Sequence, residues 1–265
     1  VGGRGGALRV MLYLHGGAFV LCKPGTLRVC TCPLARATDA LICVPEFRRP
    51  PEHTIADAVE DGLAVYAHLL QTYPGAEVWL GGESAGGGLA ASMLAMMRSR
   101  QLPFPRGALL ISPWTDLSGD GANAGLKHAG SLALEQRSAG RDYLKPDMIA
   151  WIAKLARGDM PADRVPVSPM YAEGSLEGMP PIFVVYGEDE VLRGQIEAFC
   201  DTWSGKGASV QARGVAGGVH VPVMFNFCHG PSHDVLREVS AVFGAPSKEA
   251  AAGEKQGLLA APSCC

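Results

Sequence analysis

The serine at position 84 has the surroundings of a catalytic nucleophile. It lies in the segment 82–87, Gly-Glu-Ser-Ala-Gly-Gly, which follows the apolar run 78–80 and precedes the helix-forming run 89–97. A strand, a sharp turn and a helix in this order form a nucleophile elbow, in which glycines permit a turn tight enough to expose the serine oxygen. An ordinary glycine-rich turn is the alternative, and the flanking strand and helix favour the elbow. Ser84 is therefore the predicted nucleophile for acyl transfer.

A second glycine-rich segment, 15–19, could supply an oxyanion hole. It reads His-Gly-Gly-Ala-Phe and follows the apolar, strand-forming run 9–14. Backbone N–H groups in such a loop, together with the N–H that follows the nucleophile, stabilise the oxyanion of a tetrahedral intermediate. Read alone, the segment is a turn that ends a strand, but its place upstream of the serine elbow favours the oxyanion hole. We expect the hole to be formed by the amides of Gly16, Gly17, Ala18 and Ala85.

The general base is expected after the last predicted strand. A serine nucleophile needs a base to take its proton, and in hydrolases with this elbow the chain order is serine, acid, histidine. His220 lies between the strand 210–213 and the final predicted helix, and it is the predicted base. His229 and His233 are alternatives, but they lie at or near that helix, where surface positions are expected.

The elements that must position these residues alternate along the chain, and they predict an α/β fold with a parallel sheet covered on both faces. Short apolar runs predict strands, and apolar residues at helical spacing predict helices. Strands are expected at 9–14, 40–44, 78–80, 108–111, 181–186 and 210–213, and helices at 54–69, 85–100, 146–157, 192–205 and 231–243.

One domain is expected to occupy most of the chain, because 265 residues suffice for one large α/β domain. We assign residues 1–244 to it. The polar stretch of about 117–178 contains one amphipathic helix and is too long for an ordinary loop, so it is interpreted as a cap-like insertion. Residues 245–265 are rich in Ala, Gly, Lys and Glu, which is typical of a disordered tail.

Together these motifs resemble the hormone-sensitive-lipase-like branch of the α/β-hydrolases, the family IV esterases. The segment 15–19 is similar to HGGGF and the segment 82–87 to GDSAGG, and further similarity lies at 51–61, 112–116 and 168–169. The resemblance implies an α/β-hydrolase fold and a serine hydrolase that cleaves carboxylic esters through a serine, acid and histidine triad and an acyl-enzyme. It implies a small-molecule ester as substrate, with neither an organic cofactor nor a metal.

The resemblance also bears on the acid of the triad. The family pattern is D-P-L-R-D with the first Asp catalytic, and aligning it on Leu192 and Arg193 puts Glu190 at that position. Asp189 is the alternative acid, one residue out of register. Both acids suit this role in the fold, and the alignment favours Glu190.

The chain departs from the family pattern at four points. Ala18 replaces the third glycine of the oxyanion loop, Glu83 replaces an Asp, and Gly194 replaces the second Asp of D-P-L-R-D. The family's first two strands and N-terminal cap have no counterpart before residue 15. We therefore expect the strand 40–44 to be an exposed apolar edge, and the chain alone to be poorly soluble or weakly active.

Composition excludes some functions and leaves others open. The net charge of −3 gives no electrostatic case for nucleic-acid binding, and no apolar run is long enough to predict a membrane span. Eight cysteines without a disulfide pattern suggest a reducing, cytoplasmic location. Lipidation of Cys264 and Cys265 is left open, as is a homodimer. Two alternatives to the esterase are a ligand-binding relative without catalysis and a truncated, inactive hydrolase.

Overall fold

The computed structural model describes residues 7–118 and 140–244. Six parallel strands form one sheet in the order β2-β1-β3-β4-β5-β6. Since all strands run the same way, their carboxyl ends meet at one edge, where ligands of such sheets usually bind. The strands are β1 (Arg9–Leu14), β2 (Leu41–Cys43), β3 (Glu77–Glu83), β4 (Ala108–Ile111), β5 (Ile182–Gly187) and β6 (Val210–Val215).

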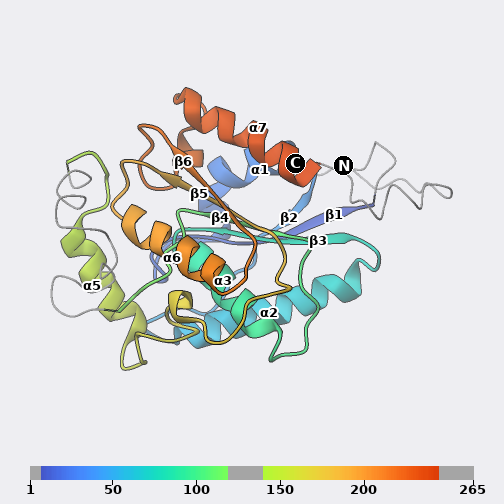
Figure 1. The fold of residues 1–265 in the computed structure, drawn as a ribbon, viewed down its shortest axis with the longest axis horizontal. Coiled ribbons are helices and arrows are strands. Elements are labelled where there is room, and N and C mark those ends of the chain that lie inside the picture. Colours follow the sequence, from blue (N-terminus) through green and yellow to red (C-terminus); the bar gives the residue numbers. More distant parts are fainter. Residues whose placement is uncertain (1–6, 119–139, 245–265) are drawn as a thin grey trace.

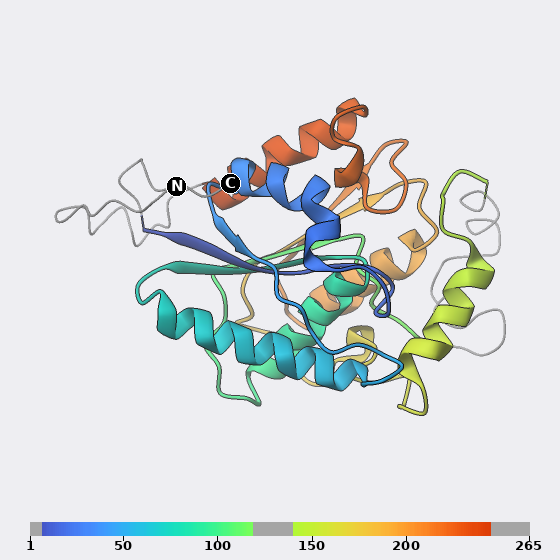
Figure 2. The same cartoon turned by 180° about the vertical axis from the view of Figure 1, so that it is seen from behind.

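Helices cover both faces of the sheet (Figure 1). On one face α1 (Arg28–Thr38) packs against α7 (Gly230–Gly244), and on the other α2 (Ile55–Thr72) packs against α3 (Ala85–Met97). The helix α6 (Arg193–Gly205) shares the second face with α2 and α3. Figure 2 shows the two layers of helices from behind, with the sheet between them. The predicted α/β class with both faces covered is confirmed.

The strand β1 shows how the sheet divides the core. Its side chains alternate between the faces: Met11 and Tyr13 join the cluster beneath α1 and α7, and Leu12 and Leu14 join the cluster beneath α2 and α3. All four are fully buried. Burial on both faces explains why this strand reads as a continuous apolar run rather than an alternating one.

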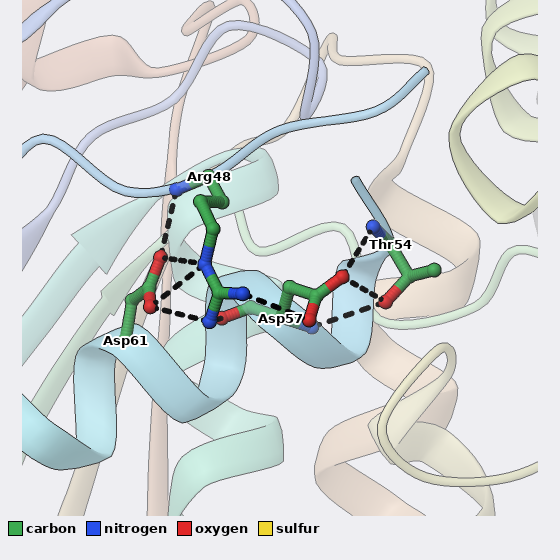
Figure 3. A network of polar contacts seen from close by, with 4 residues as sticks. All are labelled: Arg48, Thr54, Asp57 and Asp61. Carbon is green, nitrogen blue, oxygen red and sulfur yellow. Dashed lines mark hydrogen bonds and ion pairs between the residues drawn. The ribbon is translucent and has the colours of Figure 1, made fainter. Parts of the chain in front are cut away.

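A polar network fixes the start of α2 (Figure 3). The Thr54 hydroxyl accepts the Asp57 N–H at 3.1 Å, and the Asp57 carboxylate accepts the Thr54 N–H at 2.9 Å, which is a reciprocal capping box. Arg48 from the preceding loop donates to Asp57 and, from two nitrogens, to Asp61. The ion pairs are half exposed and contribute little each, but they hold the loop 44–54 against the helix.

The helix α1 is not predicted by the sequence pattern. Pro33 lies inside it, and a proline interrupts the helical hydrogen bonds and disfavours the helix. Tertiary packing overrides that local cost, because Cys30 and Leu34 are fully buried in the cluster under α7. The strand β3 is also longer than predicted, since it continues through Gly81 and Gly82 to the elbow.

The strand β2 forms one edge of the described sheet, as expected for the strand 40–44. It is three residues long, and Leu41 in it is 40% exposed. A short edge strand offers few unpaired backbone groups to another chain. The expected poor solubility of the chain stays a prediction.

The insertion between β4 and β5 is described in part. It contains α5 (Pro146–Arg157), at the bounds predicted from the sequence, and the 3-10 turn η3 (Pro169–Tyr171). In both ribbon views α5 lies beyond the carboxyl ends of the strands. The residues 119–139 of the expected cap and the expected tail 245–265 lie outside the described residues.

The start of α3 approaches the end of β1 so closely that only glycine fits at position 86. A Cβ there would collide with the carbonyl groups of Leu14 and His15. We expect Gly86→Ala to destabilise the fold by about 3 kcal/mol, because the backbone of β1 or α3 must shift. Urea unfolding monitored by tryptophan fluorescence measures the change. Gly205→Ala, which meets no atom within 4 Å, is the matched control and leaves stability unchanged or slightly raised. Equal midpoints for the two variants would contradict the packing argument.

Candidate active site

Ser84 occupies the sharp turn between β3 and α3. Its φ of 55° and ψ of −124° form a conformation that L-residues rarely adopt, so the surrounding structure must hold it. It does so through the backbone: the Ser84 N–H donates to the Ile111 carbonyl at 2.9 Å, and the Ser84 carbonyl accepts from Gly88 and Trp114. The residue is 9% exposed, and its Oγ lies 2.9 Å from Nε2 of His220.

His220 contacts both Ser84 and Glu190, so the three side chains form one chain of polar contacts. His220 lies in the loop after β6, and its Nδ1 is 3.4 Å from Oε1 of Glu190 in the loop after β5. Both side chains are buried. The distance to Glu190 is longer than that of a strong hydrogen bond. The structure thus brings together three predicted residues that come from three separate loops at the carboxyl edge.

Ser112 supports both loops, and the sequence did not indicate this role. Its hydroxyl donates to Oε2 of Glu190 at 2.5 Å and accepts the Val221 N–H at 2.9 Å. The Gly187 N–H donates to the same carboxylate oxygen at 2.7 Å. These two bonds fix Oε2 of Glu190, so the other oxygen, Oε1, is held beside the His220 ring.

The alternative residues lie elsewhere. Asp189 forms an ion pair with Arg141 at 3.0 Å. His229 bonds through Nδ1 to the Ser232 hydroxyl at 2.8 Å, and His233 lies one turn further along α7. None of the three is joined to Ser84 by any contact among the described residues.

The loop after β1 adopts an unusual backbone next to Ser84. Gly17, Ala18 and Phe19 have φ values of 113°, 55° and 65°, so three consecutive residues are left-handed. The Gly17 carbonyl accepts the N–H groups of Val20 and Leu21 at 3.1 and 2.7 Å, which closes the loop on itself. Ala85, on the other side of the serine, is the first residue of α3, and its N–H has no acceptor within that helix.

One predicted oxyanion donor is already engaged. The Gly16 N–H donates to Oε1 of Glu83 at 2.5 Å, which ties the loop after β1 to the residue preceding the nucleophile. The amides of Gly17, Ala18 and Ala85 stay as the predicted donors. The longer Glu side chain in place of the family's Asp therefore reaches across to the oxyanion loop.

Glu83 is a buried carboxyl group with an altered pKa. It is 1% exposed, and burial raises its pKa to about 7, although the hydrogen bond from Gly16 opposes the shift. The Tyr13 hydroxyl faces the carboxyl group without the geometry of a hydrogen bond, and burial raises the pKa of Tyr13 as well. Burial also raises the pKa of the neighbouring Cys30 thiol. Tyr13 and Cys30 are therefore both uncharged in the pH range in which Glu83 loses its proton.

A cavity of about 440 Å³ lies beside α2 rather than at the serine. It is lined by the loop that precedes α2 and by Asp61, and its Phe47 stacks on the His15 ring at 4.5 Å. Neither Ser84, Glu190 nor His220 lines it. Arg48 in this cavity is paired with Asp57 and Asp61. Its charge therefore stabilises the loop that precedes α2 and is not available to bind an anionic ligand.

An α/β sheet with a serine elbow and a buried histidine beside it defines the α/β-hydrolase class. The profile of the family described as "alpha/beta hydrolase fold" matches residues 11–224. The chain belongs to this family, and its resemblance to the hormone-sensitive-lipase-like branch is confirmed.

Named relatives and solved structures agree with this assignment. An acetyl-hydrolase of Streptomyces hygroscopicus is 36% identical over 72% of this chain and 60% of its own length. An esterase of Acinetobacter venetianus is 29% identical over 70% of this chain and 58% of its own length. The crystal structure of EstE7, a hormone-sensitive-lipase homologue from a metagenome library, has a TM-score of 0.79 and 27% identity and covers 91% of this chain and 79% of that one.

This chain spans about 60% of the length of these two curated relatives. Within the parts of the chain that the structure describes, none of the helices combines the length and hydropathy needed to cross a bilayer.

The raised pKa of Glu83 predicts a pH-dependent stability. The unfolded side chain titrates near 4.5 and the folded one near 7, so between these values the folded state binds more protons. Stability therefore falls as pH rises through this window, by about 3 kcal/mol in total for this one group.

Glu83→Gln tests this expectation, because the amide keeps the size of the side chain and an acceptor for Gly16 but does not titrate. Urea unfolding of both proteins at about pH 5 and about pH 8 should show a larger loss for the parent than for the variant, by up to about 3 kcal/mol. Parallel losses in the two proteins would show that Glu83 titrates normally.

Proposed function

We propose that this chain is a serine carboxylesterase in which Ser84, His220 and Glu190 form the catalytic triad. The observation that carries the proposal is the 2.9 Å separation of Ser84 Oγ from His220 Nε2, with Glu190 on the other nitrogen of the same ring. The names of the relatives, acetyl-hydrolase and esterase, support an ester as the substrate.

The geometry suggests how the acyl group is transferred. His220 Nε2 takes the proton of Ser84 as Oγ attacks the ester carbonyl carbon, and the carbonyl oxygen becomes an oxyanion. The amides of Gly17, Ala18 and Ala85 donate to that oxygen. When the tetrahedral intermediate collapses, His220 protonates the leaving alcohol, and an acyl-enzyme is left on Ser84.

Deacylation reuses the same groups. His220 takes a proton from water, the resulting nucleophile attacks the acyl carbon, and Ser84 leaves with the proton that His220 returns. Throughout, Glu190 stabilises the positive ring and holds it in the orientation that presents Nε2 to Ser84. Ala18 carries a methyl group where the family has a glycine, so we infer a preference for small to medium acyl groups.

Covalent labelling tests the nucleophile. A fluorophosphonate probe should label the folded chain at Ser84, as located by peptide mapping, and His220→Ala should slow the labelling by about 10²- to 10⁴-fold. Ser232→Ala is a matched serine control and should label at the parent rate. Absence of label on folded parent protein would contradict the esterase and favour a ligand-binding relative or an inactive hydrolase.

A pair of carboxylate variants tests the acid. Glu190→Gln should lower kcat for a short p-nitrophenyl ester by about 10²- to 10⁴-fold, because the ring loses its charged partner. Asp189→Asn should change kcat by no more than about twofold, since it breaks a surface ion pair with Arg141. The reverse pattern would assign the acid to Asp189.

A further inference from the structure

A short segment of the insertion reaches back to both loops of the proposed triad. Residues 140–145 lie immediately before α5, between β4 and β5 in the sequence. Two consecutive side chains of this segment, Asp142 and Tyr143, contact the backbone on either side of the imidazole that faces Ser84.

Asp142 joins the acid loop to the histidine loop. Its carboxylate is buried at 2% exposure. One oxygen, Oδ2, accepts the Val191 N–H at 2.8 Å, directly after Glu190, and the other, Oδ1, accepts the His220 N–H at 3.3 Å. Oδ1 also accepts the Leu144 N–H at 3.4 Å. A buried carboxylate with its acceptor sites used in this way is costly to move, because moving it leaves buried polar groups without hydrogen-bond partners.

Tyr143 contacts the backbone carbonyl of His220, the residue whose N–H donates to Asp142. Its hydroxyl donates to the His220 carbonyl at 3.1 Å, and its ring meets the imidazole edge-on with centroids 6.0 Å apart. The N–H and the carbonyl of His220 are therefore both bonded to consecutive residues of the insertion. The loops after β5 and β6 belong to neighbouring strands, and Asp142 links them at the point where Glu190 must meet His220.

We propose that Asp142 is a positioning residue, assisted by Tyr143, that keeps His220 within reach of both Ser84 and Glu190. The inference rests on the proposed function of these three residues. Reaction rates are sensitive to such placement, since a displacement of about 1 Å can cost about 100-fold. Gly194 stands where the family pattern has a second acid, and Asp142 supplies a buried carboxylate at this loop from a different part of the chain.

Asp142→Asn tests the proposal with little change of volume. The amide presents one acceptor and one donor, so either Val191 or His220 loses its acceptor and faces an N–H group instead. We expect kcat for a short p-nitrophenyl ester to fall by about 10- to 100-fold, while KM changes by less than about threefold. Rates are expressed per active site, counted from the amplitude of the p-nitrophenol burst or the fluorophosphonate label.

This normalisation separates positioning from folding. A substitution that only destabilises the chain lowers the number of competent sites and leaves kcat per site unchanged. Tyr143→Phe is a second variant that removes only one hydroxyl, and it should lower kcat per site by about 2- to 10-fold with an unchanged thermal midpoint. Arg141→Ala, the adjacent and exposed neighbour, is the control and should keep the parent kcat within about twofold.

The outcomes distinguish a failure of the proposed function from a failure of the positioning role of Asp142. Parent protein that neither labels at Ser84 nor hydrolyses the ester contradicts the proposed function itself. An active parent whose Asp142→Asn and Tyr143→Phe variants keep the parent kcat per site overturns the positioning role and leaves the triad intact. If Asp142→Asn yields no folded protein, kcat per site of Tyr143→Phe decides by the same criterion.

Discussion

The strained backbone at Ser84 is the constraint on which the rest of the site depends. Its left-handed φ is held by bonds to the end of β4 and to the segment that follows it, and by the close contact of α3 with β1. These restraints come from the strands on both sides of β3. The centre of the sheet therefore carries Ser84, and the loops after β5 and β6 bring Glu190 and His220 to it.

Two side chains link those two loops through hydrogen bonds. Ser112, at the end of β4, bonds to the Glu190 carboxylate and to the backbone beside His220, and Asp142 bonds to both loops from the opposite direction. The histidine is thus held from the sheet and from the insertion together.

Local patterns predicted much of this arrangement, and long-range pairings account for what they missed. The elbow at Ser84 and the loop at 15–19 are defined by neighbouring residues, so the sequence alone predicts them. The contacts of Ser112 and Asp142 with the loops after β5 and β6 join residues 49 to 109 positions apart, and the local sequence does not indicate these partners. The helix α1 was missed because burial outweighs the local effect of Pro33.

The carboxyl group of Glu83 has a wider consequence for how such a site varies. It contacts the loop after β1 on one side, and on the other it lies near Tyr13 and Cys30, in the core beneath α1 and α7. Amino-acid changes in that core layer alter the polarity around Glu83. A substitution in this core layer therefore also changes the pH range over which the fold is most stable, although it lies outside the contacts among Ser84, His220 and Glu190.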